Sequence, residues 1–334
     1  MPPKVSVLLP VHNGEAFLSQ ALDSLRAQSF RHFEVVAVDD GSTDGTPAML
    51  RAYARRDPRI RYFRIPRSGL VHALIAGLAR CRAPLVARMD ADDVAHPHRL
   101  AKQIAYLEAR PSVALCGTRV EIFAATPLSE GLRRYQAWIN RLVDPGDILR
   151  DLFVECPIPH PTFLFRRSRI QALGGYRDTG GPEDYDLLLR LFAAGEALGK
   201  VPEVLLRWRD HPRRHSRTHA RYSRKAFLRT KAHYLARTVL ARSPAVLWGT
   251  GGVGRFLSRA LLQEGVRLDA LVDIAPAKWG RKVRGLPVIP PHGLSAYPGR
   301  VIVGAVGTRG AREQIRAWLL ERGYRETRDF WMAA

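Results

Sequence analysis

The sequence predicts an α/β protein in which a mostly parallel sheet carries helices on both faces and is followed by a smaller α/β domain. Three observations lead to this expectation. Short runs rich in Val and Leu alternate with amphipathic stretches over the first third of the chain, which is typical of parallel sheets covered by helices. A new strand–turn–helix pattern starts after Pro244. The length of 334 residues suits two domains.

Hydrophobic patterning defines the elements of the first domain. Apolar runs predict strands at residues 5–10, 34–39, 60–65 and 85–89. Helical spacing of apolar side chains predicts helices at residues 15–28, 46–56 and 70–82. Because ligands of such sheets bind outside the carboxyl ends of the strands, the residues that follow the second and fourth strands are the first candidates for a site.

The rest of the chain adds three helices of note. Residues 184–194 have amphipathic spacing and end at Gly195. Residues 219–242 place six apolar side chains on one face and Arg or Lys elsewhere, which predicts a basic amphipathic helix. A last helix is expected at 311–322. The expected organisation is a first domain at 1–218, a basic helical linker at 219–243 and a second domain at 244–334.

Composition excludes several classes of protein. With 46% hydrophobic and 25% charged residues, the chain resembles folded globular proteins and not collagen-like or mainly disordered ones. No apolar run approaches the roughly 20 residues that a membrane span needs, and the N-terminus lacks a signal-peptide pattern. Three scattered cysteines, Cys81, Cys116 and Cys156, are expected to be buried thiols. These features predict a cytoplasmic protein.

Positive charge is the most unusual feature of the composition. Lys and Arg number 53 against 31 acidic residues, a formal net charge of +22. Residues 207–242 alone hold twelve Lys or Arg and one acid, Asp210. Such a surplus favours anionic partners such as nucleic acid, phosphorylated substrates or a membrane surface. We expect the basic helix to join the two domains and to allow peripheral contact with an anionic membrane. No nucleic acid is expected as a partner, because no recognised motif accompanies the charge.

Carboxylates gather at two strand ends of the predicted sheet. Asp39 and Asp40 close the second strand, and Asp90, Asp92 and Asp93 follow the fourth. Both groups are expected at the same sheet edge, where five carboxylates repel one another unless cations or donors compensate. Mg²⁺ and Mn²⁺ prefer oxygen ligands and share them with substrate phosphates. Any one of these residues also suits a cap or a turn, but the two groups together predict a cation site.

Seven ordered segments within residues 4–216 carry a family resemblance. They are Ser6-Val-Leu-Leu-Pro-Val-His-Asn-Gly-Glu15, Phe33-Glu-Val-Val-Ala-Val-Asp-Asp-Gly-Ser-Thr-Asp44, Ala87-Arg-Met-Asp-Ala-Asp-Asp93, Pro97-His-Arg-Leu100 with Gln103, Gly174-Gly-Tyr176, Glu183-Asp-Tyr-Asp-Leu-Leu-Leu-Arg190, and Arg209-Asp-His211 with Ser216. Together they resemble the family 2 inverting glycosyltransferases of GT-A fold. A lone Asp-x-Asp pair is weak evidence, whereas this order and spacing are specific.

The resemblance implies an enzyme that moves a sugar from a nucleoside-diphosphate sugar, with UDP as the first choice of nucleotide, to a hydroxyl acceptor such as a lipid-linked glycan. The setting it implies is surface polysaccharide or glycoconjugate synthesis at the inner face of the membrane, with Mn²⁺ or Mg²⁺ as cofactor. The donor-binding residues it implies are Pro10, Val11, His12, Asn13, Glu15, Asp40, Arg88, Asp90 and Ser216. The metal ligands it implies are Asp92 and His211, and the general base is Asp184.

Three positions qualify this resemblance. Ile75 stands where many relatives carry an Asn, so that the donor contact of that Asn is absent or comes from His72 or Arg67. By position alone, Asp184 also suits a carboxylate stabilised at a helix N-terminus. His215, four residues after His211, is expected to be solvated, because Pro212 argues against one helix that would align the two rings.

The second domain contains a glycine fingerprint. Gly249, Gly251 and Gly254 follow a predicted strand and open a helix at about 255–264, and Asp273 closes the next strand. This arrangement is typical of dinucleotide sites. The region also looks similar to Rossmann-like accessory domains of sugar-biosynthesis proteins, some of which bind a nucleotide or nucleotide-sugar while others only dock. Both roles stay open, and hydride chemistry ranks below them because no acid–base group accompanies the fingerprint.

Two other functions are weighed against glycosyl transfer. A sugar-phosphate nucleotidyltransferase also uses an α/β sheet and Mg²⁺, but it requires a glycine-rich phosphate loop that Pro10-Val-His-Asn-Gly14 does not provide. A non-catalytic basic adaptor would bind a membrane or nucleic acid through residues 207–242.

Overall fold

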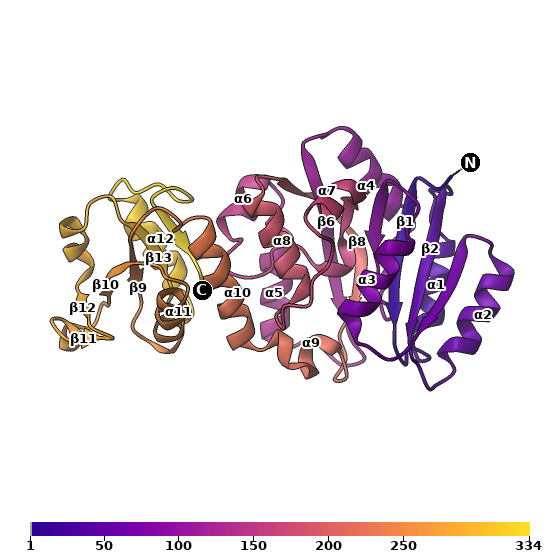
Figure 1. The fold of residues 1–334 in the computed structure, drawn as a ribbon, viewed down its shortest axis with the longest axis horizontal. Helices are drawn as coiled ribbons and strands as arrows, with labels where there is room; N and C mark the ends of the chain where they lie inside the picture. The colour runs from indigo at the N-terminus through magenta and orange to yellow at the C-terminus, as the bar shows by residue number, and fades with distance from the viewer. Residues whose placement is uncertain (1) are drawn as a thin grey trace. The chain divides into compact units, whose positions relative to one another are not determined.

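The computed structural model describes residues 2–334, which form two compact units (Figure 1). The first unit consists of the residues up to Ile148 together with Pro157–Thr179 and Asp186–Thr218. The second consists of Leu149–Cys156, Gly180–Tyr185 and His219–Ala334. Each unit has its own sheet.

The sheet of the first unit has eight strands in the order β3-β2-β1-β4-β7-β6-β8-β5. The strands are β1 Val5–Val11, β2 Phe33–Asp40, β3 Ile60–Ile65, β4 Leu85–Arg88, β5 Val94–Ala95, β6 Val113–Phe123, β7 Leu164–Arg166 and β8 Ala197–Arg209. Strands β1 to β4 are parallel to one another, and β6 is parallel to β8. Strand β7 runs antiparallel to β4 and β6, and β5 runs antiparallel to β8. The mostly parallel GT-A-type sheet that the sequence predicts is confirmed.

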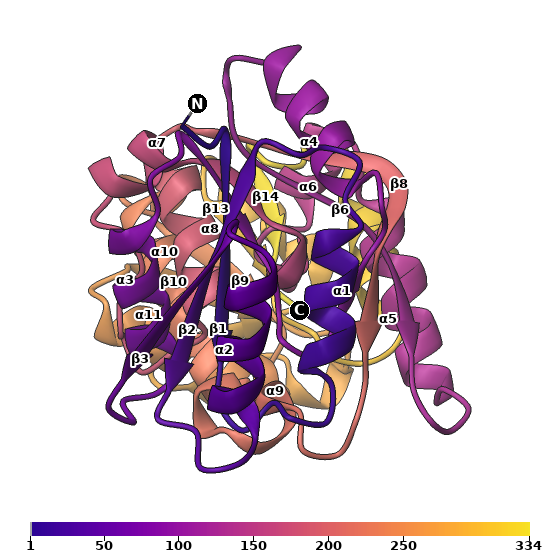
Figure 2. The same cartoon turned by 90° about the vertical axis from the view of Figure 1, so that its right-hand side faces the viewer.

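Helices cover both faces of this sheet. The helices of this part of the chain are α1 Leu18–Arg26, α2 Thr46–Arg56, α3 Leu70–Arg80, α4 Arg99–Glu108, α5 Glu130–Arg141, α6 Pro145–Arg150, α7 Arg167–Ala172, α8 Glu183–Ala193 and α9 His215–Thr218, with a 3₁₀ turn η1 at His160–Thr162. The last two residues of α6 and the first three of α8 belong to the second unit. Figure 2 shows α1 and α3 on opposite sides of β1. The alternation of the strand places Val7 and Leu9 in the same core as Leu22 of α1. On the opposite face, a Cβ on Gly77 of α3 would clash with Leu8, so this glycine allows close packing on the sheet.

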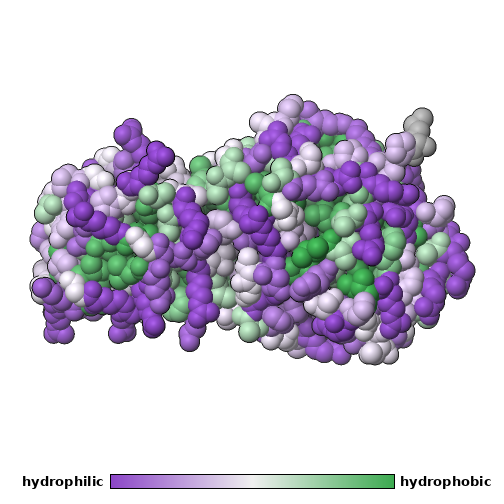
Figure 3. Space-filling view, viewed as in Figure 1, coloured by the Kyte–Doolittle hydropathy of each residue, from purple (hydrophilic) through white to green (hydrophobic). Residues whose placement is uncertain are grey.

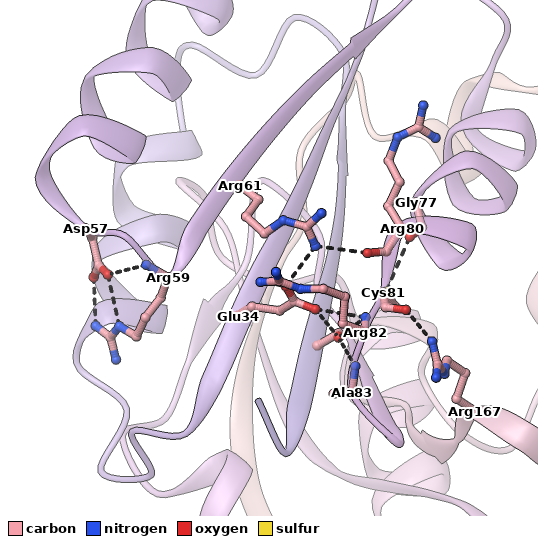
Figure 4. Close-up of polar contacts among 11 residues, drawn as sticks. Glu34, Asp57, Arg59, Arg61, Gly77, Arg80, Cys81, Arg82, Ala83 and Arg167 are labelled. Atoms are coloured by element: carbon pink, nitrogen blue, oxygen red, sulfur yellow. Dashed lines mark hydrogen bonds and ion pairs between the residues drawn. The ribbon is translucent and has the colours of Figure 1, made fainter. Parts of the chain in front are cut away.

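A buried carboxylate ties three strands together near the start of β2 (Figure 4). Glu34 is 2% exposed and accepts hydrogen bonds from Ser6 Oγ at 2.7 Å, Arg61 Nη1 at 2.8 Å, and Arg82 N and Nε at 2.9 Å. Burial alone would raise the pKa of Glu34, but these donors outweigh it, so that the pKa lies below its usual range. The carboxylate therefore stays ionised and links β1, β2, β3 and the approach to β4.

The second unit is a six-stranded sheet with the order β11-β12-β10-β9-β13-β14. Its strands are β9 Ala245–Trp248, β10 Leu268–Val272, β11 Lys282–Val283, β12 Leu286–Ile289, β13 Val301–Gly304 and β14 Phe330–Met332. All neighbours are parallel except β11 and β12. The helices are α10 Arg224–Arg237, α11 Gly252–Gln263 and α12 Ala311–Leu320, with 3₁₀ turns η2 Ala220–Tyr222, η3 Pro276–Lys278 and η4 Pro291–Ala296.

A buried lysine on α10 bonds two separate segments of the second unit. Lys231 Nζ donates to the carbonyl oxygens of Val154 at 2.7 Å and Ala333 at 3.1 Å. The side chain is 5% exposed, and burial lowers the pKa of Lys231 to about 8. The amine therefore satisfies backbone carbonyls inside the unit instead of extending from a basic surface.

The expected basic helix over 219–242 is wrong in its bounds and in part of its pattern. Helix α10 begins after Ser223, whose Oγ accepts a hydrogen bond from Ala226 N at 3.3 Å, and it ends at Arg237. Thr238 leaves helical geometry with φ −120° and ψ −87°. Lys231, assigned to the basic face from the sequence, is buried. The other predicted strands and helices named above agree with the structure to within a few residues.

On the face shown in Figure 3, hydrophilic side chains surround small apolar patches in both units. Among residues 2–334, no helix combines the length and the hydropathy needed to cross a bilayer. The three cysteines are buried and form no disulfide in this part of the chain, as expected.

Candidate active site

A cavity of about 410 Å³ lies at the carboxyl ends of β1, β2 and β4 in the first unit. One side is formed by the end of β1 and the loop after it, another by Asp40 and Arg67, and a third by Asp90–Asp92. The segment after β8 contributes His211 and two arginines. This is the sheet edge at which ligands of open α/β folds bind.

Three carboxylates form the acidic side of this region. Asp90, Asp92 and Asp93 each offer an oxygen, and these atoms lie within 4.8 Å of one another. Asp93 is 1% exposed. Its Oδ1 accepts a hydrogen bond from Arg209 N at 2.8 Å, whereas its Oδ2 has no hydrogen-bond partner among residues 2–334. Burial and the neighbouring charges of Asp92 and Asp90 raise the pKa of Asp93 well above its usual range. An unpartnered buried oxygen beside two carboxylates fits a divalent cation.

Asp90 has a cationic partner of its own. Arg88, at the end of β4, is 2% exposed and forms an ion pair with Asp90. Its backbone N–H donates to the carbonyl oxygen of Phe163 at 2.8 Å. Burial alone would raise the pKa of Asp90, but the Arg88 guanidinium outweighs it and lowers the pKa of this carboxyl. The pKa of Asp90 is therefore lowered and the pKa of Asp93 is raised, although the two residues lie in the same turn.

His211 meets Asp92 across a sequence separation of 119 residues. His211 Nε2 lies 2.9 Å from Asp92 Oδ2. Arg209 positions the same turn, because its Nε donates to the Asp92 carbonyl oxygen at 2.7 Å and its guanidinium stacks 4.4 Å from the ring centroid of Phe17. The structure thus brings together the two residues that the sequence assigns to the metal. At this distance His211 and Asp92 interact directly with each other. To bind Mn²⁺ or Mg²⁺ together, the two side chains would exchange this interaction for bonds to the cation.

The loop after β1 is fastened to the loop after β2. His12 Nδ1 lies 2.8 Å from the Asp40 carbonyl oxygen. Asn13 adopts φ 50°, donates from its N–H to Ser42 Oγ at 2.9 Å and accepts from Thr43 N at 2.9 Å. Asn is one of the residues that adopt a left-handed backbone most readily, and its side chain here joins the two loops. His12 and Asn13 line the cavity.

Glu15 has a different position from the one expected of a donor ligand. Its Oε2 accepts a hydrogen bond from Gly45 N at 2.9 Å, at the start of α2. It does not line the cavity. Its observed contact holds the two loops together.

Asp40 is buried and surrounded by donors. Its carboxylate forms an ion pair with Arg67 and accepts hydrogen bonds from Ser68 N at 2.7 Å and Gly69 N at 2.9 Å. Asp39 points elsewhere and accepts from Ser42 N at 2.8 Å and Tyr62 Oη at 3.2 Å, which is the turn role. Asp40 therefore fixes the loop that presents Arg67 to the cavity.

The structure also distinguishes the two groups considered in place of the absent Asn. Arg67 lines the cavity, whereas His72 and Ile75 do not. Ile75 is 40% exposed on α3. Arg67 is thus the residue with access to a ligand in this region.

Asp184 lies at the start of α8, within the segment Gly180–Tyr185 that belongs to the second unit. Its Oδ1 accepts a hydrogen bond from Tyr185 N at 2.7 Å, and its Oδ2 lies 3.8 Å from Cys156 Sγ. Tyr185 is buried and donates from its hydroxyl to the Leu152 carbonyl oxygen at 2.7 Å. These contacts hold the first turn of the helix that carries Asp184.

The remaining predicted residues divide into those that line the cavity and those that do not. The lining residues are Pro10, Val11, His12, Asn13, Asp40, Asp90, Asp92 and His211. Glu15, Arg88, Asp184 and Ser216 do not line it. The lining residues that the site assignment from the sequence omitted include Phe17, Arg213, Arg214 and His215.

His215, expected to be solvated, is half-buried and lines the cavity. In the second unit, Gly249, Gly251 and Asp273 line a separate cavity, and Gly254 packs against the turn below it.

Comparison with known proteins supports a family assignment. The profile of glycosyl transferase family 2 matches residues 6–174. The amylovoran biosynthesis glycosyltransferase AmsE of Erwinia amylovora is 34% identical over 208 residues, which cover 61% of this chain and 75% of AmsE.

Two solved structures share the fold. TarS of S. aureus in complex with UDP-GlcNAc superposes with a TM-score of 0.59 at 17% identity, covering 78% of this chain and 72% of that one. The mannosyltransferase PcManGT of Pyrobaculum calidifontis, in complex with GDP-Man and Mn²⁺, gives a TM-score of 0.50 at 22% identity, covering 71% and 63%. The sequence match and the α/β fold agree, and the chain belongs to glycosyl transferase family 2.

Proposed function

We propose that the protein is a metal-dependent inverting glycosyltransferase that transfers a sugar from a nucleoside-diphosphate sugar to an acceptor hydroxyl. The observation that carries the proposal is the cavity at the carboxyl edge of the first sheet. Both carboxylates, from Asp40, Asp90 and Asp92, and arginines, from Arg67, Arg213 and Arg214, line it. A diphosphate bridged to a cation requires both kinds of group.

The donor nucleotide is proposed to bind between the loop after β1 and Arg67. His12 and Asn13 form one wall of the cavity, and Asp40 holds Arg67 at the other. Arg213 and Arg214 supply positive charge for the diphosphate. A nucleotide-sugar donor is also the ligand named for TarS and PcManGT, which share this fold. UDP is the first nucleotide to test.

The cation is proposed to be held by Asp92 and His211. Their side-chain atoms lie 2.9 Å apart, and the unpartnered Oδ2 of Asp93 adds a further oxygen nearby. Asp90, paired with Arg88, is left to the ribose side of the donor. When bound, the cation would neutralise the charge of the leaving diphosphate. The oxygen-rich donor set suits Mn²⁺ or Mg²⁺.

Asp184 is proposed to be the general base. A carboxylate can take the proton of the acceptor hydroxyl as that oxygen attacks the anomeric carbon. Attack from the face opposite the leaving diphosphate inverts the anomeric configuration. Support comes from the Glu183-Asp184 pair at the start of α8 and from the bonds that hold that turn.

The proposed biological setting is the assembly of a surface polysaccharide or glycoconjugate. The name of AmsE refers to amylovoran biosynthesis. We extend the proposal to an acceptor hydroxyl on a lipid-linked glycan and to a cytoplasmic location at the inner face of the membrane. The exposed side chains of Lys225 and Arg229 on α10 provide positive charge for contact with anionic lipid.

Thermal unfolding against a panel of UDP-, GDP- and dTDP-sugars, with and without Mn²⁺, tests donor binding. A ligand that binds only the folded state raises the melting temperature by mass action. The proposal expects an Mn²⁺-dependent rise with one nucleotide class, and it expects Asp92→Asn to remove the Mn²⁺ dependence. A rise that is identical in this variant would contradict the ligand role of Asp92.

A further inference from the structure

The second unit contains a larger cavity than the first, with a volume of about 610 Å³. It lies at the carboxyl ends of β9, β10 and β13 and at the amino ends of α11 and α12. The volume is in the range of cavities that hold cofactors and nucleotides. Nothing in the proposed glycosyl transfer requires this space.

The cavity lies where the order in which the strands are added to the sheet reverses. From β9, the chain first adds β10 and then β12 on one side, and later adds β13 and β14 on the other. Parallel sheets of this order bind their ligands at the point where the order reverses. The loop between β9 and α11 lies at that point.

The three glycines of this loop have separate physical roles. Gly249 adopts φ 134°, and a Cβ there would lie 2.7 Å from the Ala305 carbonyl oxygen. A Cβ on Gly254 would clash with the Gly249 carbonyl oxygen. Gly251, by contrast, has φ −73° and no atom within 4 Å of a Cβ. The first and third glycines therefore serve the turn and the packing, while the second leaves its backbone open to the cavity, as in sites for a pyrophosphate.

Positively charged groups line the same cavity as the open glycine. Helix α11 begins at Gly252 and has twelve residues, so its first N–H groups and its dipole favour an anion. Arg224 lines the cavity, and no hydrogen bond or ion pair joins its guanidinium to another of residues 2–334. Lys278 lines it as well, but its ammonium is paired with the Asp273 carboxylate, so Arg224 is the cation available to a ligand. An anionic ligand would give Arg224 the partner that this part of the chain does not provide.

The cavity also has an apolar side. Trp248 and Trp318 lie in its wall, with ring centroids 5.1 Å apart and rings nearly perpendicular. Ile274, directly after the Asp at the end of β10, lines the cavity and is 73% exposed. In Figure 3, an apolar patch over the β9–β10 region of this unit is surrounded by hydrophilic side chains. A planar base would remove such a surface from water.

The carboxylate of the cavity is already partnered. Asp273 accepts hydrogen bonds from Thr250 Oγ1, from Lys278 Nζ at 2.7 Å and from Ala275 N at 2.9 Å. Burial alone would raise the pKa of Asp273, but these donors lower it, so that the carboxylate is ionised and paired. It orients Thr250 and Lys278 and is unsuited to moving a proton. The cavity therefore has the groups for binding and lacks, among the described residues, a pair for acid–base chemistry.

We propose that this cavity binds a nucleoside diphosphate group without transforming it. The diphosphate lies on the backbone of Gly251 and Gly252 beside Arg224, and the base lies against Ile274. The group can come from a nucleotide-sugar or from a dinucleotide such as NAD⁺. The binding site is separate from the donor site of the proposed function and independent of it.

The test measures binding of UDP, UDP-glucose and NAD⁺ to the full chain by calorimetry and by quenching of tryptophan fluorescence. It compares Asp92→Asn with the double variant Asp92→Asn/Gly251→Asp. The added carboxylate occupies the proposed phosphate position, while the φ of Gly251 and the open space around it permit a side chain. Gly251→Ala, combined with Asp92→Asn, controls for the added Cβ.

We expect the Asp92→Asn chain to bind at least one of the three probes. The Gly251→Asp substitution should then weaken binding by at least roughly tenfold, because like charges are forced together. The melting temperature without ligand should be unchanged. Preference for UDP-glucose or for NAD⁺ identifies the source of the group. Failure of all three probes to bind the Asp92→Asn chain, or equal affinity with and without Gly251→Asp, overturns the proposal and leaves the donor site untouched.

Discussion

Replacing Glu34 tests how the first sheet is held at the end opposite the cavity. Alanine at this position removes the acceptor of four hydrogen bonds (Figure 4). Two come from Ser6 Oγ, which is buried, and from Arg82 N, which is part-buried and also donates to Ser6 Oγ at 3.2 Å. Losing the Glu34 acceptor costs about 1 kcal/mol for each. The other two come from guanidinium groups whose side chains are 27% and 60% exposed, so solvent screening limits each to about 0.5 kcal/mol.

These terms give an expected loss of about 3 kcal/mol for Glu34→Ala. For a unit of this size, the loss corresponds to a fall in melting temperature of roughly 6–12 °C. Glu34→Gln keeps an oxygen acceptor and loses the charge, so we expect about half of this effect. Thermal unfolding followed by circular dichroism and calorimetry measures both. Glu130→Gln is the matched control, because Glu130 and its partner Arg134 are at least half exposed.

The effect of Glu34 depends on pH in a defined direction. Its pKa is lower in the folded state than in the unfolded state. The stabilisation is therefore fully present above the unfolded pKa and is lost as pH falls through the folded pKa. The difference between wild type and Glu34→Gln should be constant from pH 7 to 5 and should shrink below that. Equal melting of Glu34→Ala and Glu130→Gln at pH 7 would refute the reasoning.

Three further predictions concern other parts of the chain. Burial lowers the pKa of Lys231 to about 8, so between pH 8 and 10.5 the unfolded chain binds a proton that the folded chain does not. The free energy of unfolding should therefore rise with pH over this range, by up to about 3 kcal/mol relative to Lys231→Met, as measured by chemical unfolding. Gly254→Ala should destabilise the second unit because its Cβ meets backbone, whereas Gly252→Ala has open space and should unfold like wild type in the same assay. Arg209→Ala should weaken Mn²⁺-dependent donor binding by roughly 10- to 100-fold in the thermal-shift assay, because Arg209 orients the turn that carries the proposed metal ligand. Arg207 on β8 forms only an exposed ion pair with Glu121, so Arg207→Ala should leave donor binding unchanged.

The fold was predictable where local pattern and burial agree. Helix α2 and strand β3 have the predicted bounds, because Pro47 suits a first helical turn and the Ile, Tyr and Phe side chains within Ile60–Ile65 favour a strand. The helix expected over 219–242 was misjudged for a tertiary reason. Lys231 is drawn into the interior by two backbone carbonyls, which its charge in the sequence does not indicate.

The residues of the candidate site that lie at strand ends were predictable, whereas those on loops were not. The rule that ligands bind at strand ends located Asp40, Asp90 and Asp92 from the sequence, and these residues line the cavity. Arg67 and Arg214 reach the cavity through loops whose paths depend on contacts distant in sequence, such as the Asp40–Arg67 pair. Arg67 was considered from the sequence only as one of two replacements for the missing Asn, and Arg214 had no signal beyond the general excess of arginine, which does not single out positions.

Turnover of the identified donor tests the central claim most directly. Proton NMR would follow the anomeric signal during transfer to an acceptor hydroxyl, in wild type and in Asp184→Asn, with Mn²⁺ present. The account predicts a product of inverted configuration for wild type and loss of transfer in Asp184→Asn with donor binding retained. A product of retained configuration, or undiminished transfer by Asp184→Asn, would contradict the mechanism proposed for this chain.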